Sequence, residues 1–184
     1  RTIAGLITPT TGKIFIGGCD VTNLTVQSRN IGFVFQNYAL FPHMTVSDNI
    51  RFALHAYPKP TQQARIDEVL RLVGLSDLGN RLPHQLSGGQ QQQLAIARAL
   101  ASEPKVLILD EPTEGIQPSI IKDIGRIIQL IASKGNMAIV LVEQYYDFAE
   151  SLADNFYVMD RGEIVAKGAG NEMQARGIKH LVSI

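Results

Sequence analysis

The feature that most constrains the fold is a run of four consecutive apolar residues, Val106–Leu109, that ends directly in two acidic residues, Asp110 and Glu111. A strand without polar alternation must be covered on both faces, as the strands of parallel sheets are. A second apolar run, Ala138–Val142, predicts another fully buried strand, and isoleucines at helical spacing between the two runs predict a helix that begins at Pro118. Strand, helix and strand in this order predict an α/β fold with a parallel sheet and right-handed crossovers.

Shorter segments complete the expected sheet domain. Lys13–Ile16 and Ile31–Phe35 alternate in the manner of strands, and Asp160-Arg161-Gly162 predicts the turn of a C-terminal β-hairpin. The opening residues Arg1–Leu6 have the pattern of the end of an amphipathic helix, with no helix start signal before them. We therefore expect a segment to precede Arg1 in the natural chain.

The middle of the chain changes to a helical period. Two prolines within Tyr57–Pro60 mark the change, since they disfavour helix and sheet alike. Apolar residues at i, i+3, i+4 and i+7 from Ile66 then predict one helix, and a second helix is expected to follow it. We therefore expect an all-helical subdomain over about 61–103, inserted into a core formed by 1–60 and 104–184.

Composition excludes several classes of protein. Seventeen Lys and Arg against seventeen Asp and Glu give a formal net charge of zero, which argues against a broad electrostatic hold on nucleic acid. One cysteine, Cys19, excludes an intrachain disulfide framework and a cysteine-based zinc cluster. The longest apolar run, Met137–Val142, is far shorter than the roughly 20 residues that cross a bilayer. We expect a cytosolic globular chain with no nucleic-acid partner.

Asp110 and Glu111 form the first candidate site. Open α/β sheets bind ligands at the carboxyl ends of their strands. Adjacent like charges repel, and a divalent cation that shares the site with a phosphorylated ligand would relieve this repulsion. In such a site Asp110 suits a direct or outer-sphere contact to Mg²⁺, and Glu111 suits orienting or deprotonating a water. The alternative is that both residues only end the strand and cap the turn at Pro112.

Leu86-Ser87-Gly88-Gly89-Gln90 is the second candidate site. Ser87 can cap a helix, two glycines let backbone N–H groups approach a ligand, and a helix N-terminus carries partial positive charge. The alternative is a glycine-rich loop before an ordinary capped helix. Because this loop lies in the helical segment, one copy would not easily present both candidate sites to one phosphate chain, whereas two copies packed head to tail would.

The chain resembles the nucleotide-binding subunit of ABC transporters over essentially its whole length. Leu86–Gln90 matches the LSGGQ motif, Val106–Thr113 matches the Walker B segment, and Gln36 at the end of a strand matches the Q-loop. The resemblance implies a P-loop NTPase-type sheet core that binds ATP and Mg²⁺. It also implies an ATPase that powers import, works as a homo- or heterodimer with integral-membrane permease subunits, and lies peripherally on the cytoplasmic face of the inner membrane.

The resemblance also implies roles for individual residues. Glu111 would polarise the attacking water, and Gln36 and Gln144 would assist the reaction. Asp110 and Gln36 would reach the metal ion. Glu114–Gln117 occupies the D-loop position, which crosses the dimer interface. The loop that would contact the γ-phosphate of ATP on the opposite protomer consists of Ser87, Gly88, Gly89 and Gln90.

Three departures from the family pattern matter. The Walker A loop, with its phosphate-binding lysine, is absent, and the resemblance implies that it lies just before Arg1, so residues 1–184 alone are expected not to hold ATP in the family's manner. Gln144 stands at the switch position, which is usually a histidine, and a glutamine cannot carry positive charge. Gln93 stands where an arginine is common.

The subfamily features conflict. Residues 113–119 and 141–147 resemble urea and branched-chain amino acid importers, whereas Asn30–Val46 resembles sulfate, polyamine and sugar importers. We favour an importer of urea, amides or branched-chain amino acids. The alternatives are a non-transport ATPase of the same fold that acts on a soluble partner, and an inactive fragment that lacks the Walker A loop.

Overall fold

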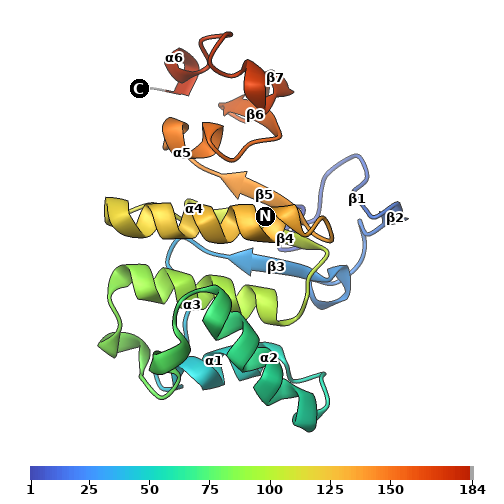
Figure 1. Cartoon of the computed structure of the whole chain (residues 1–184). Coiled ribbons are helices and arrows are strands. Elements are labelled where there is room, and N and C mark those ends of the chain that lie inside the picture. Colours follow the sequence, from blue (N-terminus) through green and yellow to red (C-terminus); the bar gives the residue numbers. More distant parts are fainter. Residues whose placement is uncertain (183–184) are drawn as a thin grey trace. The chain divides into compact units, whose positions relative to one another are not determined.

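The computed structural model describes residues 1–182, which form two compact units, Arg1–Val142 and the residues from Glu143 onward. The first unit contains a three-stranded parallel sheet in the order β3 (Ile31–Val34), β4 (Val106–Asp110) and β5 (Ala138–Val142) (Figure 1). The predicted α/β class and the parallel pairing are therefore confirmed.

The central strand is β4, because β3 and β5 pair with it on either side. Its four apolar residues are all buried, as the apolar run predicts. The prediction that Ala138–Val142 is also fully buried is wrong. Its residues are half-buried or exposed, and Val142 keeps 47% of its surface accessible. Within the described residues β5 lies at the edge of its sheet, so it is covered less than the central strand.

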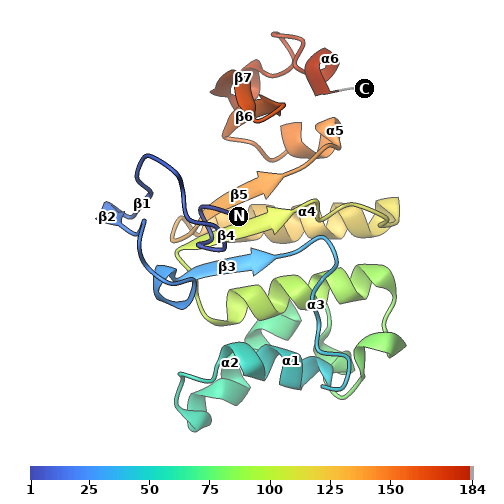
Figure 2. The same cartoon turned by 180° about the vertical axis from the view of Figure 1, so that it is seen from behind.

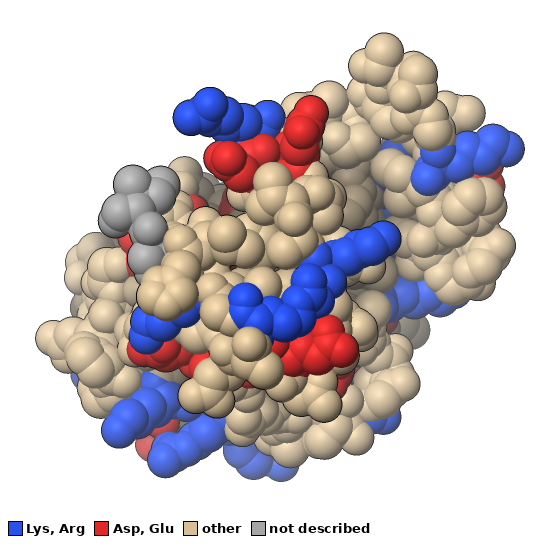
Figure 3. All heavy atoms as spheres, turned by 90° about the horizontal axis from the view of Figure 1, so that it is seen from above, with Lys and Arg blue, Asp and Glu red and all other residues tan. Residues whose placement is uncertain are grey.

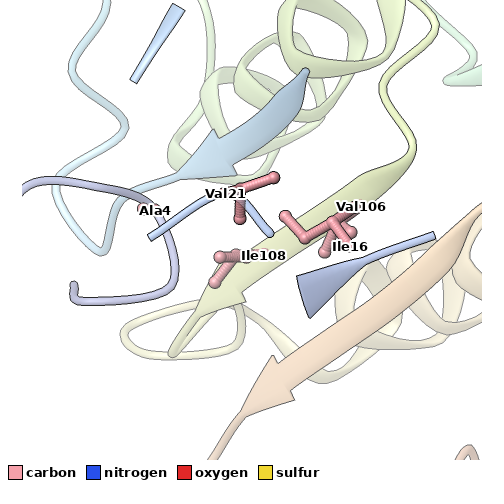
Figure 4. Close-up of a cluster of buried hydrophobic side chains, with 5 residues drawn as sticks. All are labelled: Ala4, Ile16, Val21, Val106 and Ile108. Atoms are coloured by element: carbon pink, nitrogen blue, oxygen red, sulfur yellow. The ribbon is translucent and has the colours of Figure 1, made fainter. Parts of the chain in front are cut away.

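The N-terminal segment covers one face of this sheet. It contains a short antiparallel pair, β1 (Phe15–Ile16) and β2 (Cys19–Asp20). Buried side chains of this segment pack against the side chains of β4 that point to that face (Figure 4). The cluster consists of Ala4, Ile16, Val21, Val106 and Ile108.

Two long helices, α3 (Gly88–Ala101) and α4 (Pro118–Ser133), lie on the opposite face of the sheet (Figures 1 and 2). Gly32 of β3 lets α3 approach closely, since a Cβ on Gly32 would lie 2.9 Å from the carbonyl oxygen of Ala99. Helix α4 begins at the predicted proline and ends before Gly135, which has a φ of 66°. It buries one apolar stripe, formed by Ile124, Ile127, Ile128 and Ile131.

The helical part of the first unit starts earlier than the expected segment 61–103. Helix α1 (Val46–Ala53) packs against α3, and α2 (Lys59–Leu72) packs against both. Helix α2 accommodates both prolines, because Pro58 precedes it and Pro60 lies in its first turn. No helix within residues 1–182 combines the length and apolar character that crossing a bilayer requires. Short 3₁₀ helices occupy Gln27–Arg29, Ser76–Leu78 and Pro83–Gln85.

The opening residues form a tight turn with the geometry of a helix end. The N–H of Gly5 donates to the carbonyl of Thr2 at 3.0 Å, and the N–H of Leu6 donates to the carbonyl of Arg1 at 3.1 Å. Gly5 has a φ of 79°, which is the left-handed conformation. Nested bonds of this kind around a left-handed glycine are typical of a helix C-terminus, so the local geometry agrees with the predicted helix end.

Arg29 ties this opening turn to the rest of the first unit. Its side chain is 4% exposed, and its guanidinium donates only to backbone carbonyls. Gly5 leaves room for it, since a Cβ at that position would lie 2.8 Å from Nε of Arg29. The four acceptors are the carbonyls of Thr2 (2.9 Å), Ile3 (2.8 Å), Thr22 (2.8 Å) and Leu24 (3.1 Å).

The second unit is a hairpin with short helices. Strands β6 (Asn155–Asp160) and β7 (Glu163–Ala169) pair antiparallel, and the two residues between them, Arg161 and Gly162, both have positive φ. Two left-handed residues are the geometry of a tight type I′ hairpin turn, so the predicted hairpin is confirmed. The remaining elements are α5 (Tyr146–Glu150), a 3₁₀ helix at Gly170–Glu172 and α6 (Lys179–Val182).

Charged side chains are dispersed over the surface. Figure 3 shows basic and acidic side chains interspersed on the face that it draws, in keeping with their equal numbers in the sequence. Most of the ion pairs found in residues 1–182 join residues three or four positions apart in the chain, and exposed pairs of this kind stabilise a fold by at most about 1 kcal/mol. They include Arg51–Asp48, Arg65–Glu68, Arg126–Asp123 and Arg176–Glu172.

The four bonds of Arg29 generate the first prediction. Arg29→Lys keeps the charge, but a single ammonium cannot reach all four carbonyls, so buried acceptors lose their donors. We expect the free energy of unfolding to fall by about 2–3 kcal/mol. Arg126→Lys is the matched control, because Arg126 is 77% exposed, and we expect a change within about 0.5 kcal/mol. Urea unfolding measures both, and equal losses would contradict the role given to Arg29.

Candidate functional site

Two of the predicted site residues meet at the carboxyl edge of the parallel sheet. Gln36 follows β3 and Glu111 follows β4, 75 positions later in the sequence. The side-chain Nε2 of Gln36 donates to Oε2 of Glu111 at 3.3 Å and also to the carboxylate of Glu114. Asp110, the last residue of β4, lies directly beside Glu111 in the chain and is half-buried. The edge therefore carries three carboxylates and one carboxamide.

The backbone of Glu111 is held in an unusual conformation. Its φ is 47°, which a residue with a side chain rarely adopts and which costs on the order of 1–3 kcal/mol. Its N–H donates to the carbonyl of Val142 at 2.9 Å, one position beyond the pairing of Asp110 with Val142. The end of β5 thus fixes the point at which the chain turns after β4. Such conformations persist where the surrounding structure enforces them.

The donor set at this edge is suited to a hard cation shared with a ligand. Carboxylate and carboxamide oxygens are ligands that Mg²⁺ accepts. Within residues 1–182 no three or more His, Cys, Asp or Glu side chains form a ready metal cage. Mg²⁺ usually binds through one or two carboxylates together with phosphate oxygens of a substrate, so Asp110 and Gln36 fit that ion.

The second candidate site begins α3. Ser87 is the N-cap, and its Oγ accepts a hydrogen bond from the N–H of Gln90 at 3.3 Å. Oε1 of Gln90 accepts in return from the N–H of Ser87 at 3.0 Å. This reciprocal capping box is what an ordinary capped helix needs. Ser87 and Gly88 are nevertheless exposed, so the N-terminal end of the helix remains open to a ligand.

The two glycines of this loop have different surroundings. Gly89 is buried, and a Cβ there would lie 2.5 Å from Cγ2 of Ile120 in α4. Gly88 is exposed, and a Cβ there would meet only the hydroxyl of Tyr38 at 3.8 Å. Gly89 therefore lets α3 and α4 pack closely together. Its assignment as a phosphate contact remains a prediction, as does that of Gly88.

Gln144 lies in the second unit. It is exposed, and its backbone N–H donates to Oε2 of Glu143 at 3.1 Å. The same carboxylate oxygen accepts from the N–H of Tyr145 at 3.2 Å. Glu143 thus caps the chain ahead of α5, and this arrangement orients the backbone of Gln144. Its role at the switch position remains a prediction.

Sequence reasoning gave no role at the first site to three residues that shape it. Glu114 was assigned only to the D-loop position, yet it shares the amide of Gln36 with Glu111. Its charge, after the larger effect of burial, raises the pKa of Tyr38. Asn49 and Arg98 bind the loop that follows Gln36. Asn49 lies on α1, a helix that the sequence analysis did not predict, and Arg98 lies on α3, which it did predict. No sequence motif relates either residue to Gln36, so only the folded structure shows that they contact this loop.

The contrast between the two glycines generates the second prediction. Gly89→Ala places a methyl group against Ile120 and should lower the free energy of unfolding by about 1–3 kcal/mol. Gly88→Ala meets no such obstacle and should change it by no more than about 0.5 kcal/mol. Adding Ile120→Ala to Gly89→Ala should recover part of the loss. Thermal unfolding of the three variants checks this, and equal stability of both alanine variants would contradict it.

Comparison with known proteins gives close sequence relatives. A family model described as ABC transporter matches residues 1–114 of the chain. The sulfate/thiosulfate import ATP-binding protein CysA of Brucella melitensis is 46% identical over 179 residues, which are 94% of this chain and 50% of that protein. A probable sulfate/thiosulfate import ATP-binding protein CysA of Chlorella vulgaris is 42% identical over 175 residues, 94% of this chain and 74% of that protein. The chain thus spans about half the length of its bacterial relative.

Solved structures have the same fold. A dimeric post-hydrolysis state of the ATP-binding cassette MJ0796, bound to ADP and Pi, superposes with a TM-score of 0.80 at 28% identity, over 91% of this chain and 77% of that one. MJ1267, an ATP-binding cassette of an ABC transporter, gives a TM-score of 0.87 at 24% identity, over 100% and 81% of the two chains, which speaks for the fold alone. With its motifs, its fold and a family match over 1–114, this chain belongs to the ABC transporter family.

Proposed function

We propose that the chain is part of an ATPase subunit that powers import through a membrane transporter, and that ATP is hydrolysed at the carboxyl edge of its parallel sheet. The observation that carries this proposal is the hydrogen bond from Gln36 to Glu111 across the carboxyl edge of the sheet. It places a neutral amide beside a carboxylate where α/β sheets bind phosphorylated ligands. The reaction proposed is the attack of water on the γ-phosphate of ATP.

Glu111 acts on the attacking water in this mechanism. Its carboxylate accepts a hydrogen bond from the water, orients it and receives its proton as the new bond to phosphorus forms. Gln36 fixes the position of that carboxylate through its Nε2. The left-handed backbone of Glu111, tied to Val142, sets the direction from which the side chain reaches the site.

Mg²⁺ would be held by Asp110 and Gln36 together with the phosphates. When bound, the ion neutralises charge that develops on the phosphate oxygens. Asp110 contributes one carboxylate at the end of a buried strand, so its position is set by the pairing of β4 on both sides. A carboxamide carries both a donor nitrogen and an acceptor oxygen, so Gln36 can donate from Nε2 to Glu111 and offer its oxygen to the ion.

The second half of the site comes from another copy in this proposal. The exposed N-terminus of α3, with Ser87 and Gly88, supplies N–H groups and partial positive charge to the γ-phosphate. A homo- or heterodimer places this loop opposite the Gln36–Glu111 edge of its partner. The dimeric state of the solved cassette MJ0796 with ADP and Pi supports such an arrangement. The subunit would act peripherally, against permease subunits at the cytoplasmic face of the membrane.

The relatives favour an oxyanion as the transported substrate. The sequence features favoured urea, amides or branched-chain amino acids, but the relatives found carry names of sulfate/thiosulfate importers, with an Fe(3+) importer at 42% identity among them. The resemblance of Asn30–Val46 to sulfate importers agrees with these names. We therefore propose sulfate or thiosulfate as the substrate class, in place of urea or amino acids.

Glu111→Gln tests the proposed chemistry. The variant keeps the size of the side chain but cannot take a proton, so we expect the turnover of ATP to fall by at least about 100-fold. Binding of Mg-ATP should change less than about threefold, because the phosphate contacts remain. The measurements are phosphate release and nucleotide titration on the natural full-length protein.

Glu163→Gln is the matched control for this test. Glu163 is exposed at the start of β7, in the second unit, and its replacement should leave turnover unchanged. Turnover by Glu111→Gln at the rate of the unsubstituted protein would refute the role proposed for Glu111.

A further inference from the structure

The loop that follows Gln36 contains two consecutive residues in the left-handed conformation. Tyr38 has a φ of 61° and Ala39 a φ of 46°. Neither is a glycine, and an L-residue loses stability in this conformation because its Cβ approaches the following carbonyl. Something outside the loop must therefore hold the pair. The turn matters because it comes two residues after the glutamine that contacts Glu111.

Arg98, in the last turns of α3, binds this pair directly. Its Nη1 donates to the carbonyl of Ala39 at 2.8 Å, and its Nη2 donates to the carbonyl of Tyr38 at 3.2 Å. The guanidinium also lies over the ring of Phe41, 5.4 Å from the ring centre. A planar fork with several donors can bind two adjacent carbonyls at once, which a lysine ammonium does poorly.

Asn49 of α1 anchors the far end of the same loop. It is fully buried, and its Oδ1 accepts from the N–H of Phe41 at 2.9 Å. Its Nδ2 donates to the carbonyls of Phe41 at 3.1 Å, Met44 at 3.1 Å and Thr45 at 3.0 Å. The segment from Phe41 onward is therefore fixed by α1. Between Gln36 and Phe41, Arg98 adds side-chain bonds to the loop's own backbone bonds, which run from the N–H of Tyr38 to Phe35 at 2.9 Å and from the N–H of Ala39 to Asn37 at 2.6 Å.

We propose that Arg98 is a positioning residue for the site: it holds the left-handed pair Tyr38–Ala39 and thereby keeps the amide of Gln36 on Glu111. Arg98 donates to the carbonyls of Ala39 and Tyr38, so it acts on Gln36 through the backbone of the loop. The same helix begins at Gly88, directly after Ser87, so α3 sets both the loop of Gln36 and the second candidate site. The effect on turnover rests on the proposed ATPase function, whereas the effect on the loop does not.

Hydrogen exchange of backbone amides tests the hold on the loop. Arg98→Lys should speed exchange in the peptide 36–41 by about tenfold, because the N–H of Tyr38, bonded to Phe35 at 2.9 Å, loses its enforced geometry. Exchange in β4 should stay unchanged, which shows that the sheet remains folded. Unchanged exchange in 36–41 would overturn the proposal.

Arg65→Lys is the matched control variant. Arg65 also donates to backbone carbonyls, those of Leu100 at 2.8 Å and Ala101 at 3.1 Å, but it does not touch the loop. It should leave exchange in 36–41 within about twofold of the unsubstituted chain. If Arg65→Lys sped exchange in 36–41 as much as Arg98→Lys, the proposal would fail, because the effect would then be a general loosening of α3.

Two further variants test the same hold on the loop, and the first of them keeps Arg98 in case Arg98→Lys folds poorly. Phe41→Leu leaves the guanidinium but removes the ring beneath it, and should speed exchange of the same amides by about threefold. Ala39→Gly combined with Arg98→Lys should restore part of the protection, because glycine adopts the left-handed conformation without the steric cost. The recovery by Ala39→Gly is the deciding result, because Phe41 also packs on Phe52, with ring centres 4.6 Å apart, and Phe41→Leu loses that contact too.

Turnover by the natural full-length protein separates the two proposals. Arg98→Lys should lower kcat for ATP hydrolysis by about tenfold and change KM by a smaller factor, since Gln36 orients Glu111 but is only one of the groups proposed to hold Mg²⁺ and the phosphates. If the unsubstituted protein hydrolyses no ATP, the proposed function fails, while hydrogen exchange still decides the role of Arg98. A normal kcat together with a loosened loop would overturn the link from Arg98 to the site.

Discussion

The pairing of β4 on both sides is the constraint on which the rest of the structure depends. A strand that is hydrogen-bonded to two neighbours and covered on both faces has no freedom to shift, because a slip of one residue would turn every buried side chain to the other face. Leu107 and Leu109 are fully buried on the helix side, and Val106 and Ile108 meet the N-terminal segment on the other. The backbone positions of Asp110, which ends this strand, and of Glu111, which follows it, are therefore fixed as well.

Helix α3 links the two candidate sites within one copy. Its first residue follows the capping box of Ser87, its middle packs on α1 and α2, and Arg98 near its end binds the loop of Gln36. At Gly89 and Gly32 the absence of a side chain lets α3 approach α4 and β3 closely. A displacement of this helix would therefore move both the Ser87 loop and the contacts that Arg98 makes with the loop of Gln36.

The sequence predicted the elements well where one local signal decided the outcome. The apolar run of β4, the capped start of α3 and the hairpin turn at Arg161 were all recognisable from neighbouring residues. It placed β5 correctly but overstated its burial, because an apolar run does not reveal whether a strand has one neighbour or two. The contacts of Gln36 with Glu114, and of Arg98 with the loop, join positions far apart in the chain. Only tertiary structure brings such partners together.

The hydrogen bond from the N–H of Glu111 to the carbonyl of Val142 lies within the first unit, between the turn after β4 and the last residue of β5. The edge strand carries none of the motif residues of the sheet edge, yet its last carbonyl holds the backbone of Glu111. A substitution that frays the end of β5 would therefore disturb the acidic corner of the sheet without touching any of its side chains.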